Sequence, residues 1–146
     1  MLSKTCKYAI RAVAYIAYKG NNSDVAVGVK KIKEDIDIPV SFLSKILQTL
    51  VRQSILKSYK GPSGGFVLAK KPKEITLLDI VKIFDGESSF SNCLLEKRNC
   101  EASDSTPCFM HEKYHKIKQE WYDMLRNETL AETIKSIEVL GGIQSI

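Results

Sequence analysis

The chain has 146 residues, of which 44% are hydrophobic and 27% are charged. This is enough for one domain with a modest core, and too little for an enzyme with separate cofactor and substrate domains. The longest apolar run, residues 12–18, is far shorter than the ~20 residues that cross a bilayer. The first residues lead into helix-like periodicity rather than into an apolar signal segment. These features predict a cytoplasmic protein without a membrane segment.

The net charge of +5 conceals an asymmetry along the chain. Residues 1–85 contain 15 lysines and arginines against 7 acidic residues, whereas residues 86–146 contain 7 against 10. A basic first part and a mildly acidic second part indicate that the first part contacts a polyanion such as DNA. A merely solvated basic surface is the alternative.

Helical periodicity dominates the first fifty residues. The spacing of apolar residues from Tyr8 to Ala17 predicts a helix capped by Ser3 or Thr5, and a second helix of two to three turns follows before Pro39. A third helix is predicted with Ser41 as its N-cap. Its inward face consists of Leu43, Ile46, Leu47, Leu50 and Val51. Two short helices joined by a tight turn are typical of a helix-turn-helix.

The outer face of the third predicted helix has the chemistry of a DNA-reading surface. Its residues are small or able to form hydrogen bonds, as a helix in a major groove requires. The predicted DNA-contacting residues are Ser41, Phe42, Ser44, Lys45 and Gln48.

A glycine-rich hairpin is predicted next. Residues 55–59 and 66–69 have strand character, and the segment between them forms a thin basic tip that suits a minor groove or phosphates. The tip consists of Lys60, Gly61, Pro62, Ser63, Gly64 and Gly65. Plain turn chemistry is the alternative, but a phosphate-binding nucleotide loop fits poorly because no helix follows the glycines. Together these elements predict a mainly α fold with a small β-hairpin, a winged helix-turn-helix.

The second half of the chain is predicted to contain three more helices. Thr76 opens the first of them, and its buried face is predicted to consist of Leu77, Ile80, Val81 and Phe84. A long helix starts near His111. A capping box at Thr129 starts a short helix that ends near Val139. The long helix has an apolar stripe of Tyr114, Ile117, Trp121, Met124 and Leu125. We expect it to pair with its copy in a dimer, or alternatively to pack on its own domain.

The aperiodic segment between these helices contains a group of candidate metal ligands. Cys93, Cys100, Cys108 and His111 lie within 19 residues. Three thiols and an imidazole suit an iron–sulfur cluster or a zinc ion, and three thiols without a metal are the remaining interpretation. His111 is preferred over His115 because it adjoins Cys108. Cys6 is predicted to be a buried apolar residue outside this site.

Four stretches of the chain together resemble one protein family. Residues 8–12, 38–47, 61–69 and 75–81 are similar to the Rrf2 family of bacterial winged-helix transcription regulators. The resemblance implies a homodimer that binds double-stranded DNA at a pseudo-palindromic operator and, in many members, holds a [2Fe-2S] cluster on three cysteines. Cys93, Cys100 and Cys108 match these cysteines, and His111 matches the histidine that some members use as the fourth ligand.

The chain departs from the family pattern at two places. The gaps between the cysteines are longer, and Ser44 and Lys45 replace a glutamate and a glutamine of the recognition helix. The operator sequence therefore cannot be transferred.

The sequence thus predicts a transcription regulator, and not an enzyme, in three parts. Residues 1–86 form the DNA-binding region, residues 87–110 the cysteine-rich cluster-binding loop, and residues 111–146 the dimerisation helix with a short C-terminal helix. The predicted function is repression controlled by iron–sulfur, redox or nitric oxide status. The alternatives are a cluster-free regulator that uses zinc, thiol oxidation or a small metabolite, and, more remotely, a redox enzyme or electron carrier.

Overall fold

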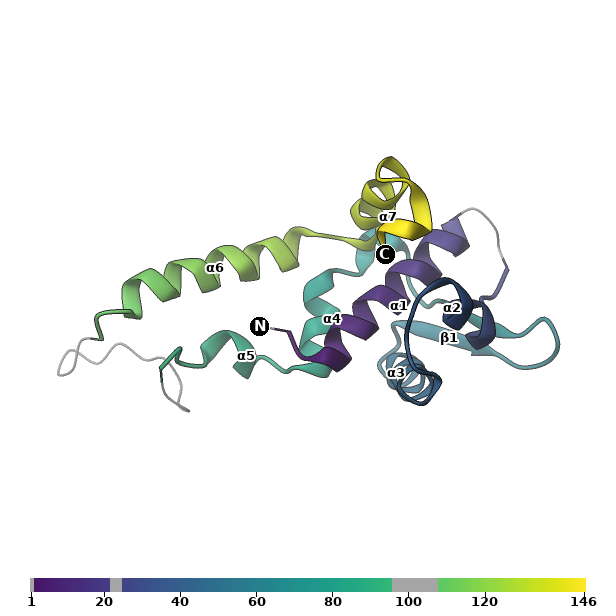
Figure 1. The fold of residues 1–146 in the computed structure, drawn as a ribbon, viewed down its shortest axis with the longest axis horizontal. Coiled ribbons are helices and arrows are strands. Elements are labelled where there is room, and N and C mark those ends of the chain that lie inside the picture. The colour runs from purple at the N-terminus through teal and green to yellow at the C-terminus, as the bar shows by residue number, and fades with distance from the viewer. Residues whose placement is uncertain (1, 22–24, 96–107) are drawn as a thin grey trace.

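The computed structural model describes residues 2–21, 25–95 and 108–146, and Figure 1 shows a helical fold with one two-stranded hairpin. The first part contains α1 (Lys4–Asn21), α2 (Val29–Asp35), α3 (Val40–Arg52), β1 (Leu56–Tyr59) and β2 (Gly65–Leu68). The second part contains η1 (Pro72–Glu74), α4 (Leu77–Phe84), α5 (Ser88–Ser91), α6 (His111–Asn127), α7 (Leu130–Val139) and η2 (Gly142–Ser145). None of the described helices is long and apolar enough to span a membrane.

Helix α1 is the centre of the core. The Ser3 hydroxyl accepts a hydrogen bond from the Cys6 amide at 3.1 Å, so Ser3 caps the helix, as one of the two predicted caps. The helix contacts α3, α4, α7 and the hairpin, and its buried side chains join those of α3 in one hydrophobic cluster. The predicted winged-helix fold is therefore confirmed in its core.

The helix-turn-helix consists of α2 and α3. A buried tyrosine fastens it to α1: the Tyr15 hydroxyl donates to the Asp35 carboxylate at 2.5 Å, and Lys31 adds an ion pair at 3.0 Å. These contacts lower the pKa of the Asp35 carboxyl, first through the Tyr15 hydrogen bond and then through Lys31. Burial, followed by the carboxylate, raises the pKa of Tyr15. The hydroxyl therefore stays protonated and keeps α2 against α1.

The start of α3 differs from the prediction. The N-cap is Pro39, whose carbonyl accepts hydrogen bonds from the amides of Phe42 and Leu43 at 3.0 Å, and Ser41 lies inside the first turn. The predicted serine cap was wrong because the fixed φ of proline already sets the entry to the helix two residues earlier. The predicted inward face is confirmed for four residues, and Val51 is only half-buried.

The hairpin pairs Leu56 with Leu68 and Tyr59 with Gly65. Gly65 therefore belongs to β2 and not to the predicted tip. A second pairing explains this: the backbones of Val27 and Phe66 exchange two hydrogen bonds of 2.9 Å, which draws the start of β2 against the segment before α2. A Cβ on Gly65 would lie 2.5 Å from the Val27 carbonyl carbon, so only glycine fits this approach.

The starts of α4 and α7 are held together. Both have capping boxes, at Thr129 with Glu132, as predicted, and at Thr76 with Asp79, where only the helix start was predicted. The Leu77 amide donates to the Glu128 carbonyl and the Leu130 amide to the Ile75 carbonyl, each at 2.9 Å. The end of α6 is thus joined to the DNA-binding region by backbone hydrogen bonds. Helix α7 packs on α1, and Leu130 and Ile134 belong to the same core cluster.

Helix α6 extends away from the core, toward the left of Figure 1, while the hairpin reaches the right end. Its near side packs on α4 through a small cluster around Leu78, Val81 and Leu125. The sequence missed Leu78 as a buried residue and α5 as a helix. The predicted apolar stripe divides: Leu125 is buried within the chain, whereas Ile117 and Met124 are 62% and 55% exposed. The three-part division of the chain stays a prediction.

Candidate nucleic-acid interface and metal centre

The predicted DNA-contacting side chains of α3 lie on its outer surface. Ser41, Phe42, Lys45 and Gln48 are exposed, and Ser44 is half-buried. The opposite face of the helix is fully buried, with Leu43, Leu47 and Leu50 at 0% exposure. The hydrophobic core therefore fixes which side of α3 is presented.

Phe42 has contacts that sequence reasoning missed. Its ring meets the ring of Tyr8 edge to face at a centroid distance of 6.2 Å, and the Lys4 ammonium lies 5.7 Å from the Tyr8 ring centroid. Lys4 and Tyr8 are one turn apart on α1. These ring contacts place the first turns of α1, which carry the positive charge of Lys4, beside the start of α3, the predicted recognition helix. The spacing of four between Lys4 and Tyr8 was the available signal.

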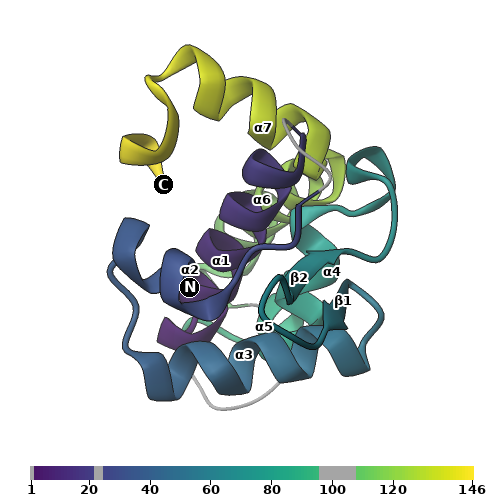
Figure 2. The ribbon, with the colours of Figure 1, turned by 90° about the vertical axis from the view of Figure 1, so that its right-hand side faces the viewer.

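The wing extends beyond the core as a narrow loop. Lys60, Gly61, Pro62 and Ser63 are exposed, Gly64 is half-buried, and Gly61 has a positive φ of 105°. A Cβ on Gly64 would lie 2.3 Å from the Tyr59 carbonyl oxygen, so glycine is required for the tight turn. Helix α3 contacts β1, and Figure 2 shows α3 running below the hairpin. The recognition helix and the wing therefore form one structural unit.

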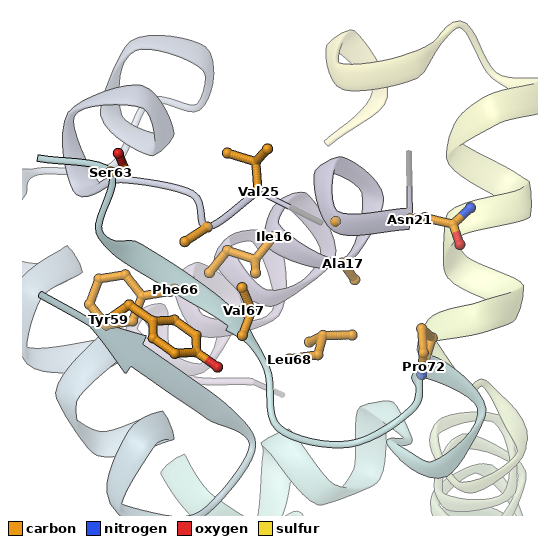
Figure 3. A pocket seen from close by; sticks show the side chains of 12 residues that line it. Ile16, Ala17, Asn21, Val25, Tyr59, Ser63, Phe66, Val67, Leu68 and Pro72 are labelled. Atoms are coloured by element: carbon orange, nitrogen blue, oxygen red, sulfur yellow. The ribbon is translucent and has the colours of Figure 1, made fainter. Parts of the chain in front are cut away.

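A hollow of about 800 Å³ lies between the hairpin and the C-terminal end of α1 (Figure 3). Ile16 and Ala17 form part of its wall on α1, while Phe66 and Leu68 belong to β2. Tyr59 and Ser63 place hydroxyl groups on its lining. Its volume lies within the range of small-molecule sites.

The structure brings three of the four predicted metal ligands to one place. Cys93, Cys108 and His111 line the same small pocket near the start of α6, although Cys93 and Cys108 are 15 positions apart. The other walls are Leu94, Leu95, Met110 and Tyr114. Cys100 lies outside the described residues.

Local hydrogen bonds hold these candidate ligands in place. The His111 amide donates to the Cys108 carbonyl at 3.0 Å, which fixes the turn before α6. The Leu95 amide approaches the Cys93 sulfur at 3.4 Å. His115 stacks on His111 with ring centroids 5.9 Å apart, but does not line the pocket with Cys93 and Cys108. Placement therefore favours His111 over His115 as a ligand.

The donor set fits a thiolate-held metal centre. Two sulfurs and one imidazole surround an otherwise apolar pocket, and thiolate with imidazole is the ligand chemistry of iron–sulfur clusters and zinc. Within residues 2–21, 25–95 and 108–146, no three Cys, His, Asp or Glu side chains are grouped closely enough to hold a metal ion, and this includes Cys93, Cys108 and His111. The predicted ligand set with Cys100 therefore stays a prediction.

Cys6 lies outside this site, as predicted. It is fully buried in α1, and burial, followed by the neighbouring Asp85 carboxylate, raises the pKa of its thiol to about 12. A thiol that stays protonated is a poor ligand and a poor nucleophile. Cys6 therefore offers a matched control for substitutions at the other cysteines.

The helix-turn-helix, the glycine-tipped wing and the exposed basic recognition helix define a winged-helix DNA-binding protein. The model of the Rrf2 family of iron-dependent transcriptional regulators matches residues 2–136. The chain belongs to this family. At the level of the family it is a transcription regulator and not an enzyme, and the resemblance seen in the sequence is confirmed.

Individual relatives agree with this assignment. An HTH-type transcriptional regulator of Aquifex aeolicus is 35% identical over 134 residues, covering 92% of this chain and 91% of the relative. The regulator IscR of Klebsiella pneumoniae is 25% identical, covering 95% and 82%. Among solved structures, CymR, the global cysteine regulator of B. subtilis, is similar with a TM-score of 0.77 and 20% identity, covering 93% of this chain and 97% of that one. IscR of T. potens gives a TM-score of 0.72 at 22% identity, covering 97% and 90%.

Proposed function

We propose that this regulator is a dimeric repressor that senses iron–sulfur, redox or nitric oxide status through a [2Fe-2S] cluster held by Cys93, Cys100, Cys108 and His111. The observation that carries the proposal is the convergence of Cys93, Cys108 and His111 on one pocket at the start of α6. Similarity to IscR and to an iron-dependent family supports it. When bound, the cluster supplies a centre whose charge and ligation change with oxidation, nitric oxide or iron supply.

The chain's own residues would read the operator from two sides. The outer face of α3 would enter the major groove, and Lys60 with the thin tip would contact phosphates or the minor groove. Two copies would bind half-sites ~34–36 Å apart or a multiple of that spacing. The exposed Ile117 and Met124 lie seven residues apart on one side of α6, and we propose that this stripe pairs with a second copy.

The wing is tested by Lys60→Ala. Operator affinity should fall for every sequence, and the log–log salt dependence should weaken by a slope of ~0.9 for each phosphate that the variant no longer neutralises. Lys116→Ala, which removes an exposed lysine from α6, is the matched control. Electrophoretic mobility shifts across a salt series measure both quantities. An unchanged slope in Lys60→Ala would remove the wing from the interface.

The cluster is tested by purification without oxygen, with measurement of visible absorption, iron, sulfide and zinc. We expect about two irons and two sulfides per chain, as a [2Fe-2S] centre requires. Cys108→Ala and Cys100→Ala should lose them, whereas the matched variant Cys6→Ala should retain them because its thiol is buried elsewhere. Iron-free wild-type protein would refute the cluster.

The fourth ligand is tested by a second matched pair. His111→Ala should lose or destabilise the cluster, while His115→Ala, one turn further along α6, should keep it. Only neutral imidazole coordinates, so cluster retention should also fall as the pH drops toward acid values. Equal iron content in the two variants would exclude His111 as a ligand.

The second candidate function is a regulator without a cluster. Two observations favour it: Cys93 and Cys108 share a pocket where zinc or thiol oxidation would act, and the hollow beside the wing has space for a small metabolite. The fold similarity to CymR of B. subtilis, a cysteine regulator, and to an oxidized form of CymR from Staphylococcus aureus supports this candidate.

The two candidates are separated by the response of iron-free protein. If oxidant or zinc changes its operator affinity, and Cys108→Ala removes that change, the cysteine pocket acts without a cluster. If neither matters, Val25→Trp, which adds a bulky side chain to the lining of the hollow, should alter operator affinity. Operator binding that needs iron and sulfide in wild-type protein would exclude this candidate.

A further inference from the structure

Lys118 is the only charged side chain that is buried among the described residues. Lys118 lies in the middle of α6, on the side that faces the rest of the chain, and is 7% exposed. A buried ammonium is costly unless hydrogen bonds or an opposite charge compensate for the missing hydration. An apolar side chain would fill the same place without that cost, so the contacts of the ammonium group require an explanation.

Among the described residues, the ammonium group has two polar contacts, and both connect it to the pocket of Cys93, Cys108 and His111. Lys118 Nζ donates to the Asn92 carbonyl at 3.3 Å, and Asn92 directly precedes Cys93. The same nitrogen lies 4.9 Å from the ring centroid of Tyr114, which lines the pocket together with Cys93, Cys108 and His111. Lys118 therefore ties the segment that carries the first cysteine to the helix that carries His111.

Among the described residues, the charge of Lys118 has no partner of opposite sign. The ion pairs in that part of the chain involve Lys19, Lys31 and Lys82, and none of its carboxylates lies within 4.0 Å of Lys118. A carbonyl dipole and an aromatic ring satisfy the ammonium group only in part. The remaining positive potential is directed at the neighbourhood of Cys93, where an anionic group would be stabilised.

We propose that Lys118 is a positioning residue for the metal centre: it fixes Cys93 against α6 through the Asn92 carbonyl and supplies the positive charge that balances the anionic cluster. This inference rests on the proposed function. A [2Fe-2S] core held by three thiolates and a neutral imidazole is net negative, and reduction adds one further negative charge. A nearby buried cation therefore favours the reduced state and retention of the cluster.

The test compares three variants. Lys118→Met keeps the apolar stem but removes the charge and the donor, Lys118→Arg restores both, and Lys116→Met removes an exposed lysine from the same helix as a control. The first measurement is amide hydrogen exchange of residues 88–95 in iron-free protein. We expect exchange at least threefold faster in Lys118→Met and rates near wild type in the other two variants, because only the first lacks a donor to the Asn92 carbonyl.

The second measurement is the reduction potential of the anaerobically purified protein. In Lys118→Met, the ratio of reduced to oxidised cluster at a fixed poise should fall roughly tenfold, which corresponds to about 59 mV for a one-electron couple. Lys118→Arg should restore most of this ratio. A purely structural role in packing α6 would leave the potential unchanged.

The outcomes separate the two levels of the proposal. Wild-type exchange rates in Lys118→Met overturn the anchoring role, whether or not iron is found. A wild-type potential in Lys118→Met overturns the electrostatic role. Iron-free wild-type protein refutes the proposed function and with it the charge balance, while faster exchange in the same sample would still support the anchor.

Discussion

The DNA-binding region and the start of α6, near Cys93 and Cys108, differ in how many of their polar groups have partners among the described residues. In the first region, helix starts are capped, the wing is paired with Val27, and Tyr15 fastens α2 through Asp35. At the start of α6, two cysteines and a histidine share a pocket without forming a group of three metal ligands. In the middle of α6, Lys118 is buried, and no carboxylate among the described residues pairs with it. Under the proposed function, an external signal would act on the second region, where the described residues alone do not form a metal site.

The largest effect is expected from a substitution in the exposed apolar stripe of α6, which contains Ile117 and Met124. Ile117→Glu places a charge on the exposed apolar side of the helix, which should prevent pairing of two copies. Operator affinity should fall by roughly 10²- to 10⁴-fold, because two linked heads gain about this much over one. Sedimentation and mobility shifts measure the two effects.

The control for this variant is Lys116→Glu, which changes an exposed residue next to Ile117. Lys116→Glu should keep the wild-type Tm, and Ile117→Glu should lose only the stabilisation that pairing adds, because neither position belongs to the core clusters. A dimeric Ile117→Glu with normal operator affinity would contradict the proposed pairing surface.

A smaller effect is expected inside the DNA-binding region. Tyr15→Phe removes the hydrogen bond that lowers the pKa of Asp35 and should lower Tm. A carboxyl with a lowered folded-state pKa contributes stability above its unfolded pKa, about 4, and loses that contribution as the pH falls through the folded pKa. The Tm deficit should therefore be present at neutral pH and shrink in acid.

Thermal unfolding of Tyr15→Phe and wild type between neutral pH and about pH 3 measures this dependence. Tyr18→Phe, another hydroxyl deletion on α1, serves as the control because Tyr18 is not among the groups that shift Asp35. A deficit independent of pH in Tyr15→Phe would mean that the hydroxyl stabilises α2 by packing and not through the carboxylate. Metal content should be unaffected, since Tyr15 does not line the cysteine pocket.

The smallest expected effect is a gain in stability. Ser54 follows the C-cap of α3, Gln53, and has a positive φ of 57°. Its amide donates to the Val51 carbonyl and the Ile55 amide donates to the Leu50 carbonyl, each at 3.0 Å. Glycine normally occupies such a position at a helix end. Ser54→Gly should therefore stabilise the protein by about 0.5–1 kcal/mol, measured by urea denaturation. Ser54→Ala should not, and a gain in both variants would assign the effect to removal of the hydroxyl.

Local signals in the sequence predicted most of the fold. The capping boxes at Thr76 and Thr129 place the starts of α4 and α7 correctly, because a cap depends on residues only three positions apart. The strands of the hairpin were placed to within one residue. One error arose where a distant segment decides: Gly65 belongs to β2 because Val27 pairs with Phe66. The other was local, because Pro39 takes the cap assigned to Ser41 two residues later.

The candidate sites were predictable to different depths. The exposed face of α3 followed from helical periodicity, and the structure confirms its exposure. Clustering of cysteines in the sequence indicated Cys93 and Cys108, yet their shared pocket with His111 needed the fold. Lys4 and Tyr8 offered only their spacing of four residues, because their connection to Phe42 needed the fold. Lys118 gave no functional signal, because its role depends on a contact with Asn92 in another segment.

The backbone hydrogen bonds that join the starts of α4 and α7 also decide which end of α6 is held and which end can move. They clamp the C-terminal end of α6, whose 17 residues reach about 26 Å to the cysteine end. If α6 moves as a rigid rod, these hydrogen bonds make its C-terminal end the pivot. A swing of about 5° displaces the cysteine end by roughly 2 Å over this length. Conversely, if two copies pair through α6 as proposed, a small rearrangement around Cys108 would rotate one DNA-binding region relative to the other.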